Sequence, residues 1–244
     1  MEPGLSHRNP RVVEAARLHR SEERARQGLT LLEGPHLVQE ALRAGVALHV
    51  VFALPSDRDW SQLSGVEVVT VSEEALKRLS STRTPQSPVA VMEIPSHHLD
   101  PSRSFLVAWQ ISDPGNLGTM IRTSAAFGLD VAVTPGSTDP WSPKVLRAAM
   151  GGHFRTAVAP VEDVSWLEVT KVAAVMSGGV TPRAMPGGRL ALLLGSEAHG
   201  LPDDVATTAD IKVTIPMPGG TESLNAASAA AILAYEASRK RSEG

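Results

Sequence analysis

The sequence contains no cysteine, and this absence excludes several kinds of site at once. Without thiols the chain forms no disulfides, offers no thiolate nucleophile and cannot bind zinc through cysteine. Aromatic residues are scarce as well, with one Tyr, four Phe and four Trp among 244 residues. Few rings are therefore available to stack on a ligand.

Long apolar runs are also missing. No run approaches the roughly 18 residues of a membrane-spanning helix, and the opening stretch MEPGLSHRNP has none of the features of a secretion signal. We therefore expect a cytoplasmic protein without a membrane anchor. The net charge of −3 argues against a general nucleic-acid coat, but it permits a local basic site.

Residues 1–95 predict a small α/β domain. Asn9 followed by Pro10 is a favourable helix start, and we expect this helix to reach about Arg26. Residues 7–26 hold six Arg and two His against three Glu. This composition fits either a solvated helix with Glu–Arg pairs or an arm that faces RNA. The other elements expected here are helices at 35–45 and 72–79 and strands at 29–34, 47–54, 66–71 and 88–94.

The polar stretch at 96–103 predicts a linker. His97 and His98 lie side by side in it, but neither a cysteine nor a further histidine stands at ligand spacing. We therefore expect solvated linker residues here and no metal site.

Residues 104–244 predict a second, larger α/β domain. Continuous apolar runs that alternate with helices are typical of a mostly parallel sheet covered on both faces. Ligands bind outside the carboxyl ends of the strands in such sheets. The expected strands are 104–111, 130–135, 171–179, 189–197 and 210–218, and the expected helices include 142–152 and 223–241.

Three of these strand ends are rich in glycine and polar residues. The first, DPGNLGTMIR at 113–122, is neither the G-x-G-x-x-G fingerprint of nicotinamide enzymes nor a P-loop. Asn116 can donate and accept hydrogen bonds. We expect Arg122 within about the first turn of the helix that follows, where its planar guanidinium suits a phosphate.

The second strand end, GSEAHGL at 195–201, offers Glu197 and His199. We interpret the lone histidine as incidental rather than as a general base. The third, IPMPGGTESLN at 215–225, ends where a helix begins, and we expect Ser223 to cap that helix.

Together these segments resemble the SpoU (TrmH) branch of the SPOUT methyltransferases. The resemblance rests on N-x-G-x-x-x-R at 116–122, G-S-E-x-x-G-L at 195–201, I-P-M-x-G-x-x-E-S-L-N at 215–225 and the connecting segment P-K-V-x-R-A-x-M-G at 143–151. Their order and spacing cover essentially all of residues 104–240. One small departure follows Asn225, where the family tends to have Val-Ser and this chain has two alanines.

The resemblance implies transfer of a methyl group from S-adenosylmethionine (SAM) to a ribose 2′-hydroxyl of RNA. It also implies a deep trefoil knot in the C-terminal SPOUT domain and a homodimer in which each site borrows residues from the partner. The cofactor-binding positions that it implies are Ser177, Gly178, Leu194, Gly195, Ile215, Met217 and Leu224. The catalytic positions that it implies are Arg122, Asn116, Glu197, Ser223 and Asn225. Arg122 would act across the dimer and stabilise negative charge as it develops on the 2′-oxygen.

The N-terminal domain resembles the small substrate-binding domain of the family's ribosomal-RNA members, through NPRVVEAARLHR and LTLLEGPHLVQEALRAG. That domain is similar to a ribosomal protein that binds kinked RNA. The resemblance therefore implies large-subunit (23S) ribosomal RNA as the substrate. Two alternatives stay open at this point: a transfer-RNA 2′-O-ribose methyltransferase, and a non-catalytic RNA-binding protein on the same fold.

Overall fold

The chain folds into two compact units, each with its own sheet and core. The computed structural model describes residues 4–57, 60, 65–196, 199–221 and 223–242. One unit comprises Met1–Pro95 with Trp141–Phe154, and the other comprises Ser96–Pro140 with Arg155–Gly244. None of the helices in the described part of the chain has both the length and the apolar character needed to cross a membrane.

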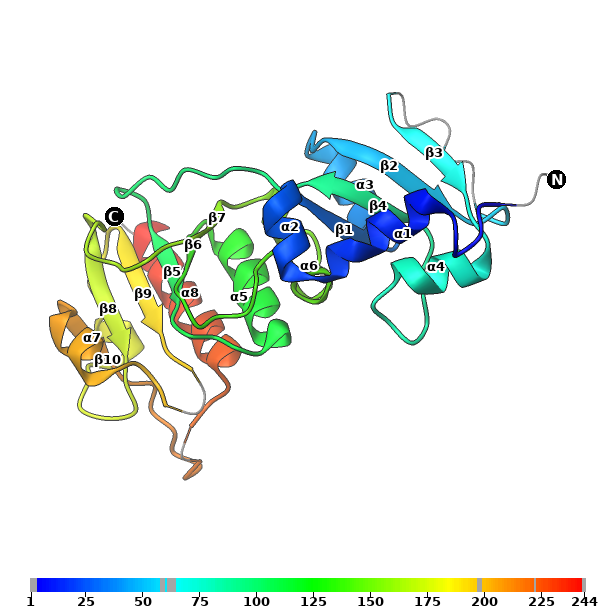
Figure 1. Cartoon of the computed structure of the whole chain (residues 1–244). Coiled ribbons are helices and arrows are strands. Elements are labelled where there is room, and N and C mark those ends of the chain that lie inside the picture. The colour runs from blue at the N-terminus through cyan, green and yellow to red at the C-terminus, as the bar shows by residue number, and fades with distance from the viewer. Residues whose placement is uncertain (1–3, 58–59, 61–64, 197–198, 222, 243–244) are drawn as a thin grey trace. The chain divides into compact units, whose positions relative to one another are not determined.

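The first unit contains a four-stranded sheet in the order β1-β4-β2-β3 (Figure 1). Strand β4 runs antiparallel to β1 and β2, whereas β3 is parallel to β2. The strands are β1 Leu29–Glu33, β2 Leu48–Ala53, β3 Glu67–Thr70 and β4 Val89–Glu93. The helices of this unit are α1 Pro10–Ala16, α2 Ser21–Gln27, α3 Pro35–Arg43, α4 Glu73–Leu79 and α6 Pro143–Ala149.

The expected single helix from Pro10 to Arg26 is wrong, because the chain breaks at Arg20. This residue has an extended backbone and separates α1 and a short 3₁₀ turn from α2. The cause is Arg24, whose buried guanidinium donates to the carbonyls of Leu18 (2.8 Å) and His19 (3.0 Å). A continuous helix would need the same carbonyls for its own ladder.

The segment Trp141–Phe154 packs in the first unit, although the sequence analysis places it in the second domain. Two contacts hold it against β1. Thr30 Oγ1 donates to the carbonyl of Trp141 (2.7 Å), and Arg147 Nη1 on α6 donates to the carboxylate of Glu33 (2.6 Å). The Glu33 side chain is 3% exposed and also accepts from Thr82 Oγ1 (2.8 Å).

The second unit contains a six-stranded sheet in the order β10-β8-β9-β5-β6-β7, and all neighbouring strands are parallel. The expected mostly parallel sheet is confirmed. Its strands are β5 Phe105–Ala108, β6 Asp130–Val133, β7 Val158–Pro160, β8 Thr170–Ala174, β9 Leu190–Leu194 and β10 Ile211–Val213. Strand β7 is not among the strands that the sequence predicts. His97, expected to be solvated, is half-buried, and its Nδ1 accepts from Val158 N on this strand (2.9 Å).

Helices cover both faces of this sheet. Two long helices, α5 Pro114–Phe127 and α8 Ala226–Ser242, pack side by side on one face (Figure 1). The short helix α7, Asp203–Thr208, contributes Val205 and Ala206 to a core with Phe105, Val107 and Leu193 on the other face. The segments that follow the strands therefore begin from a well-packed core.

Substitution of Arg147 tests whether its ion pair with Glu33 holds α6 in the first unit. Because Arg147→Met leaves the buried Glu33 carboxylate without its counter-charge, we expect this variant to lose about 2–4 kcal/mol of unfolding free energy in urea titrations. The matched control is Arg11→Met, which breaks the exposed pair of Arg11 with Glu67 and should cost less than about 1 kcal/mol. Equal stability of the two variants would contradict this assignment.

Candidate functional site

The glycine-rich segments after β5, β9 and β10 meet at one edge of the second unit's sheet. Parallel strands place their carboxyl ends at the same edge, so segments far apart in the sequence come together there. Two cavities lie at this edge, with volumes of about 870 and 330 Å³. They share Ser196, His199 and Ala226 as lining residues, so the two cavities adjoin.

The larger cavity brings together nearly all of the residues that were predicted to hold the cofactor. Its volume is in the range of typical small-molecule sites. Apolar side chains suited to an adenine ring line it together with polar groups. The predicted residues in its lining are Ser177, Leu194, Gly195, Ile215, Met217 and Leu224, joined by Ser223. Gly178 is not among the lining residues.

The chain forms one wall of this cavity by ending β8 early. The expected strand 171–179 stops at Ala174, and the following residues close around the end of β10. The N–H groups of Val175 and Val180 donate to the carbonyls of Val213 and Lys212 (both 2.9 Å). Gly179 makes this possible, since a Cβ on it would lie 2.7 Å from the Val213 carbonyl carbon.

Gly195 allows an even closer approach at the end of β9. A Cβ at this position would lie 2.0 Å from the backbone carbon of Gly200 and 2.2 Å from the nitrogen of Leu201. The family resemblance places Gly195 at the cofactor, but the nearest obstacle to a side chain here is the chain's own backbone. Gly195 is therefore required for this loop to fold against its strand.

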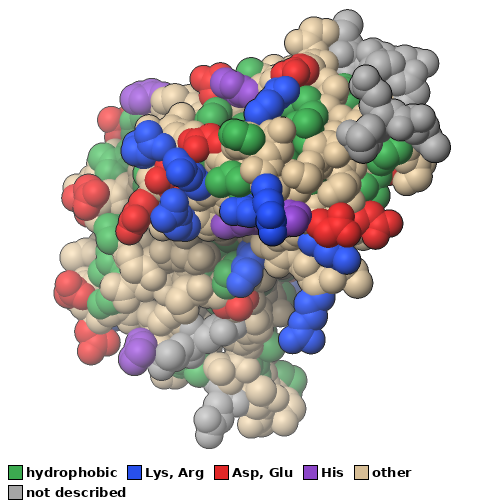
Figure 2. Space-filling view, turned by 45° about the vertical axis from the view of Figure 1, so that its right-hand side comes forward, with side chains coloured by type: hydrophobic (Ala, Val, Ile, Leu, Met, Phe, Trp, Pro, Cys, Tyr) green, Lys and Arg blue, Asp and Glu red, His purple; other side chains and the backbone are tan. Residues whose placement is uncertain are grey.

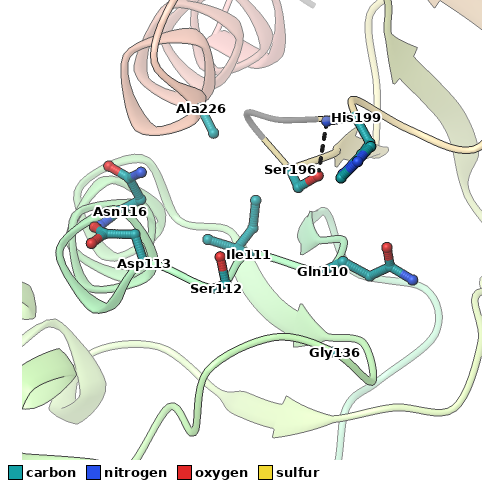
Figure 3. Close-up of a pocket in the computed structure, with 9 residues that line it drawn as sticks. All are labelled: Gln110, Ile111, Ser112, Asp113, Asn116, Gly136, Ser196, His199 and Ala226. Atoms are coloured by element: carbon teal, nitrogen blue, oxygen red, sulfur yellow. Dashed lines mark hydrogen bonds between the residues drawn. The ribbon is translucent and has the colours of Figure 1, made fainter.

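The smaller cavity lies beside a hydrogen bond between the first and third motifs. Asn225 Oδ1 accepts from Ala227 N (2.9 Å) and so caps α8, while its Nδ2 donates to Asn116 Oδ1 (2.8 Å). Asn116 in turn lies in the first turn of α5, where Asp113 Oδ1 accepts from its N–H (2.8 Å) (Figure 3). The expected cap at Ser223 is wrong, because α8 begins at Ala226 and Asn225 performs this role.

Arg122 lies elsewhere on α5. The helix begins at Pro114, so the glycine-rich turn is itself helical and Arg122 falls in the third turn rather than the first. Its side chain is exposed and lines neither cavity of its own chain. No hydrogen bond or ion pair joins it to another residue in the described ranges, so its guanidinium is free to contact another molecule.

The remaining predicted residues have mixed outcomes. Glu197 lies outside the described residues. His199 was interpreted as incidental, yet it lines both cavities, and its N–H donates to Ser196 Oγ (3.3 Å). Among the residues that the structure describes, no group of three His, Asp or Glu could hold a metal ion. Sequence reasoning missed Gln110, Ser112 and Asp113 as lining residues of the smaller cavity, because nothing in their spacing marks them.

Two family models match the chain. The model described as the SpoU rRNA Methylase family matches residues 103–235, which is more than half of the sequence. The model described as the MRM3-like substrate binding domain matches residues 9–90. The two matches fall on the two halves that the sequence patterns separate.

Similar proteins match along almost the whole chain. The 23S rRNA (guanosine(2553)-2′-O)-methyltransferase RlmP of Bacillus subtilis is 35% identical, over 94% of this chain and 96% of its own. An AdoMet-bound rRNA methyltransferase from Sinorhizobium meliloti has a TM-score of 0.85 at 29% identity, covering 95% of both chains. The SpoU methyltransferase AviRb from Streptomyces viridochromogenes, in complex with AdoMet, has a TM-score of 0.86 at 26% identity, covering 97% of this chain and all of its own.

Gly195 provides a test of how the larger cavity is built. Because even a methyl group at this position overlaps the backbone of Gly200, we expect Gly195→Ala to displace the loop, lower the Tm and abolish SAM binding in calorimetry. Gly187→Ala is the matched control, since the nearest atom to its new Cβ would be 3.9 Å away. Wild-type SAM affinity in Gly195→Ala would show that the close approach is not needed.

Proposed function

The chain belongs to the SpoU rRNA methylase family, and from this premise we propose that it methylates a ribose 2′-hydroxyl of 23S ribosomal RNA in the cytoplasm. It is a SAM-dependent RNA 2′-O-methyltransferase. The observation that carries the choice of substrate is the end-to-end match to a 23S rRNA 2′-O-methyltransferase, which includes the N-terminal domain. A transfer-RNA substrate is the competing possibility.

SAM supplies a methyl group on a positively charged sulfur when it is bound. The ribose 2′-oxygen would accept that methyl group and lose its proton to water, and the cofactor would keep the electron pair of the bond that it gives up. Asn116 and Asn225, joined by their hydrogen bond, orient the ribose beside the two helix starts. Ser223 and Glu197 complete the polar positions, and the residues that line the larger cavity, with the neighbouring Gly178, hold the cofactor.

Arg122 acts in the site of a partner subunit in this proposal. Its side chain is exposed on α5 and lines neither of the two cavities described above. The neighbouring helix α8 exposes Ile232 (38%) and Tyr235 (54%), and the Tyr235 ring contacts Phe127 at the end of α5. Exposed apolar side chains on α8 and an exposed, unpaired arginine on the helix packed against it support a homodimer formed through α5 and α8. In the partner's site, the guanidinium would stabilise charge on the 2′-oxygen.

The proposed domains are an RNA-binding domain at 1–95, a linker at 96–103 and a methyltransferase domain at 104–244, with α6 packing against the first. The arginines of the N-terminal helices contribute little net charge to RNA binding. Arg11 pairs with Glu67, and Arg26 pairs with Glu23. The hydrogen bond from Arg26 lowers the pKa of Glu23, so this carboxylate stays charged. These pairs favour the solvated-helix interpretation over the RNA-facing arm.

Other cations are better placed to meet phosphates. Lys77 and Arg78 on α4 and Arg83 in the loop after it are exposed, and none pairs with an acid among the described residues. Figure 2 shows Lys and Arg side chains, with acidic ones among them, across one face of this unit.

The knot implied by the family resemblance stays a prediction. The close backbone approaches at Gly179 and Gly195 support it.

Methyl transfer to separated RNA pools tests the proposed substrate. With tritiated SAM, we expect label in 23S ribosomal RNA, at one nucleotide whose 3′ linkage resists alkali because its 2′-oxygen is methylated. Transfer RNA incubated in parallel should remain unlabelled. Label only in transfer RNA would favour the competing substrate, and cofactor binding without label in any RNA would favour a non-catalytic role.

Mixed dimers test the role of Arg122. Arg122→Ala should lose at least about 100-fold in kcat while its SAM affinity stays unchanged, since the loss of one charge-stabilising group costs this much. Leu224→Arg should fill the larger cavity and prevent SAM binding, while its exposed position tolerates the charge.

If Arg122 acts across the dimer, co-refolding the two inactive variants restores a mixed dimer with one complete site, and activity returns. If Arg122 acts within its own chain, no mixed dimer has a complete site. Absence of activity in purified mixed dimers would therefore contradict action across the interface.

A further inference from the structure

Gln110 holds a backbone conformation that residues other than glycine rarely adopt. It lies just after β5 with φ +53°, in the left-handed region. Among the described residues, the other non-glycine position with positive φ is Met150, which forms the C-terminal cap of α6. A left-handed residue commonly ends a helix. Gln110 follows a strand, so a helix end does not explain its conformation.

The turn at Gln110 is fixed by hydrogen bonds that three consecutive backbone N–H groups donate. The N–H groups of Trp109, Gln110 and Ile111 donate to Leu194 O (2.9 Å), Thr134 Oγ1 (3.1 Å) and Ser137 Oγ (3.0 Å). None of these bonds uses the Gln110 side chain. Glycine at this position would make the same bonds without strain, so the side chain itself needs a different explanation. Strained residues of this kind gather at functional sites.

The Gln110 side chain is exposed and lines the smaller cavity. Its stem rests on Gly136, where a Cβ would lie 3.1 Å from Gln110 Cγ. Its amide forms no hydrogen bond with any residue in the described part of the chain. Figure 3 shows Gln110 and His199 on one side of the cavity and Asp113 and Asn116 on the other.

The chemistry of this cavity suits an uncharged ring with polar edges. No Lys or Arg is among its described lining residues, and the Asp113 carboxylate would repel a phosphate. Its 330 Å³ lies near the lower limit of small-molecule sites. The cavity adjoins the larger cavity through Ser196 and His199, and Asn116 links it to the proposed ribose position.

We propose that the smaller cavity receives the base of the nucleotide being methylated, and that the Gln110 amide reads the edge of that base. This inference rests on the proposed function and adds a specificity-determining residue to it. The base leaves its stack to enter the cavity, as in other enzymes that act on single nucleotides. An amide donates and accepts at once, so it can distinguish bases by their pattern of donors and acceptors.

Gln110→Gly separates this role from a structural one, because glycine relieves the strained φ and removes only the side chain. The substrates are short transcripts around the nucleotide that the wild-type enzyme methylates, with each of the four bases at that nucleotide. We expect kcat/KM for the native base to fall about 10- to 100-fold, as for the loss of one bidentate base contact, and the preference among bases to disappear. The Tm should not fall, and SAM affinity should stay unchanged.

Met150→Gly is the matched control, since it relieves the same kind of strain in the other unit and should leave base preference intact. Gln110→Glu replaces a donor with an acceptor and should shift preference toward bases whose edges offer donors. Wild-type kcat/KM and base preference in Gln110→Gly would overturn this inference alone. A wild-type enzyme that labels no RNA would instead overturn the proposed function, and this inference with it.

Discussion

The contact between Gly195 and the backbone of Gly200 and Leu201 shapes the whole functional edge of the sheet. It brings Gly200 and Leu201 back against the end of β9, with no room for a side chain between them. Ser196 and His199 then stand where the two cavities adjoin. Without this close approach, the larger cavity would lose a wall and its separation from the smaller one.

The pair Asn116 and Asn225 joins the starts of the two long helices. At the functional edge, two such ends are tied together by one side-chain hydrogen bond of 2.8 Å. The bond couples the first and third motifs, so a ribose would meet one preorganised pair of amide side chains rather than two independent loops.

The sequence predicts the parallel sheet and the meeting of the three motifs because both follow from local patterns and strand direction. The sequence does not predict features that depend on particular side-chain contacts made only in the folded chain. Arg24 interrupts the first helix because its guanidinium donates to backbone carbonyls that the helix would need. The ion pair of Arg147 with Glu33 holds α6 in the first unit. The sequence predicts Arg122 in about the first turn of a helix that follows the glycines, but the Asp113 cap includes the glycines in α5, so Arg122 lies two turns further along. The strained φ of Gln110 has no sequence signal at all.

A crystal structure of the protein grown with SAM would show whether the three distant segments build one cofactor site. We expect the cofactor in the larger cavity, with its adenine against Leu194, Ile215 and Met217 and its methyl group directed toward the smaller cavity. Cofactor bound outside this cavity, or with its methyl group turned away from Asn116, would mean that these segments do not form the site.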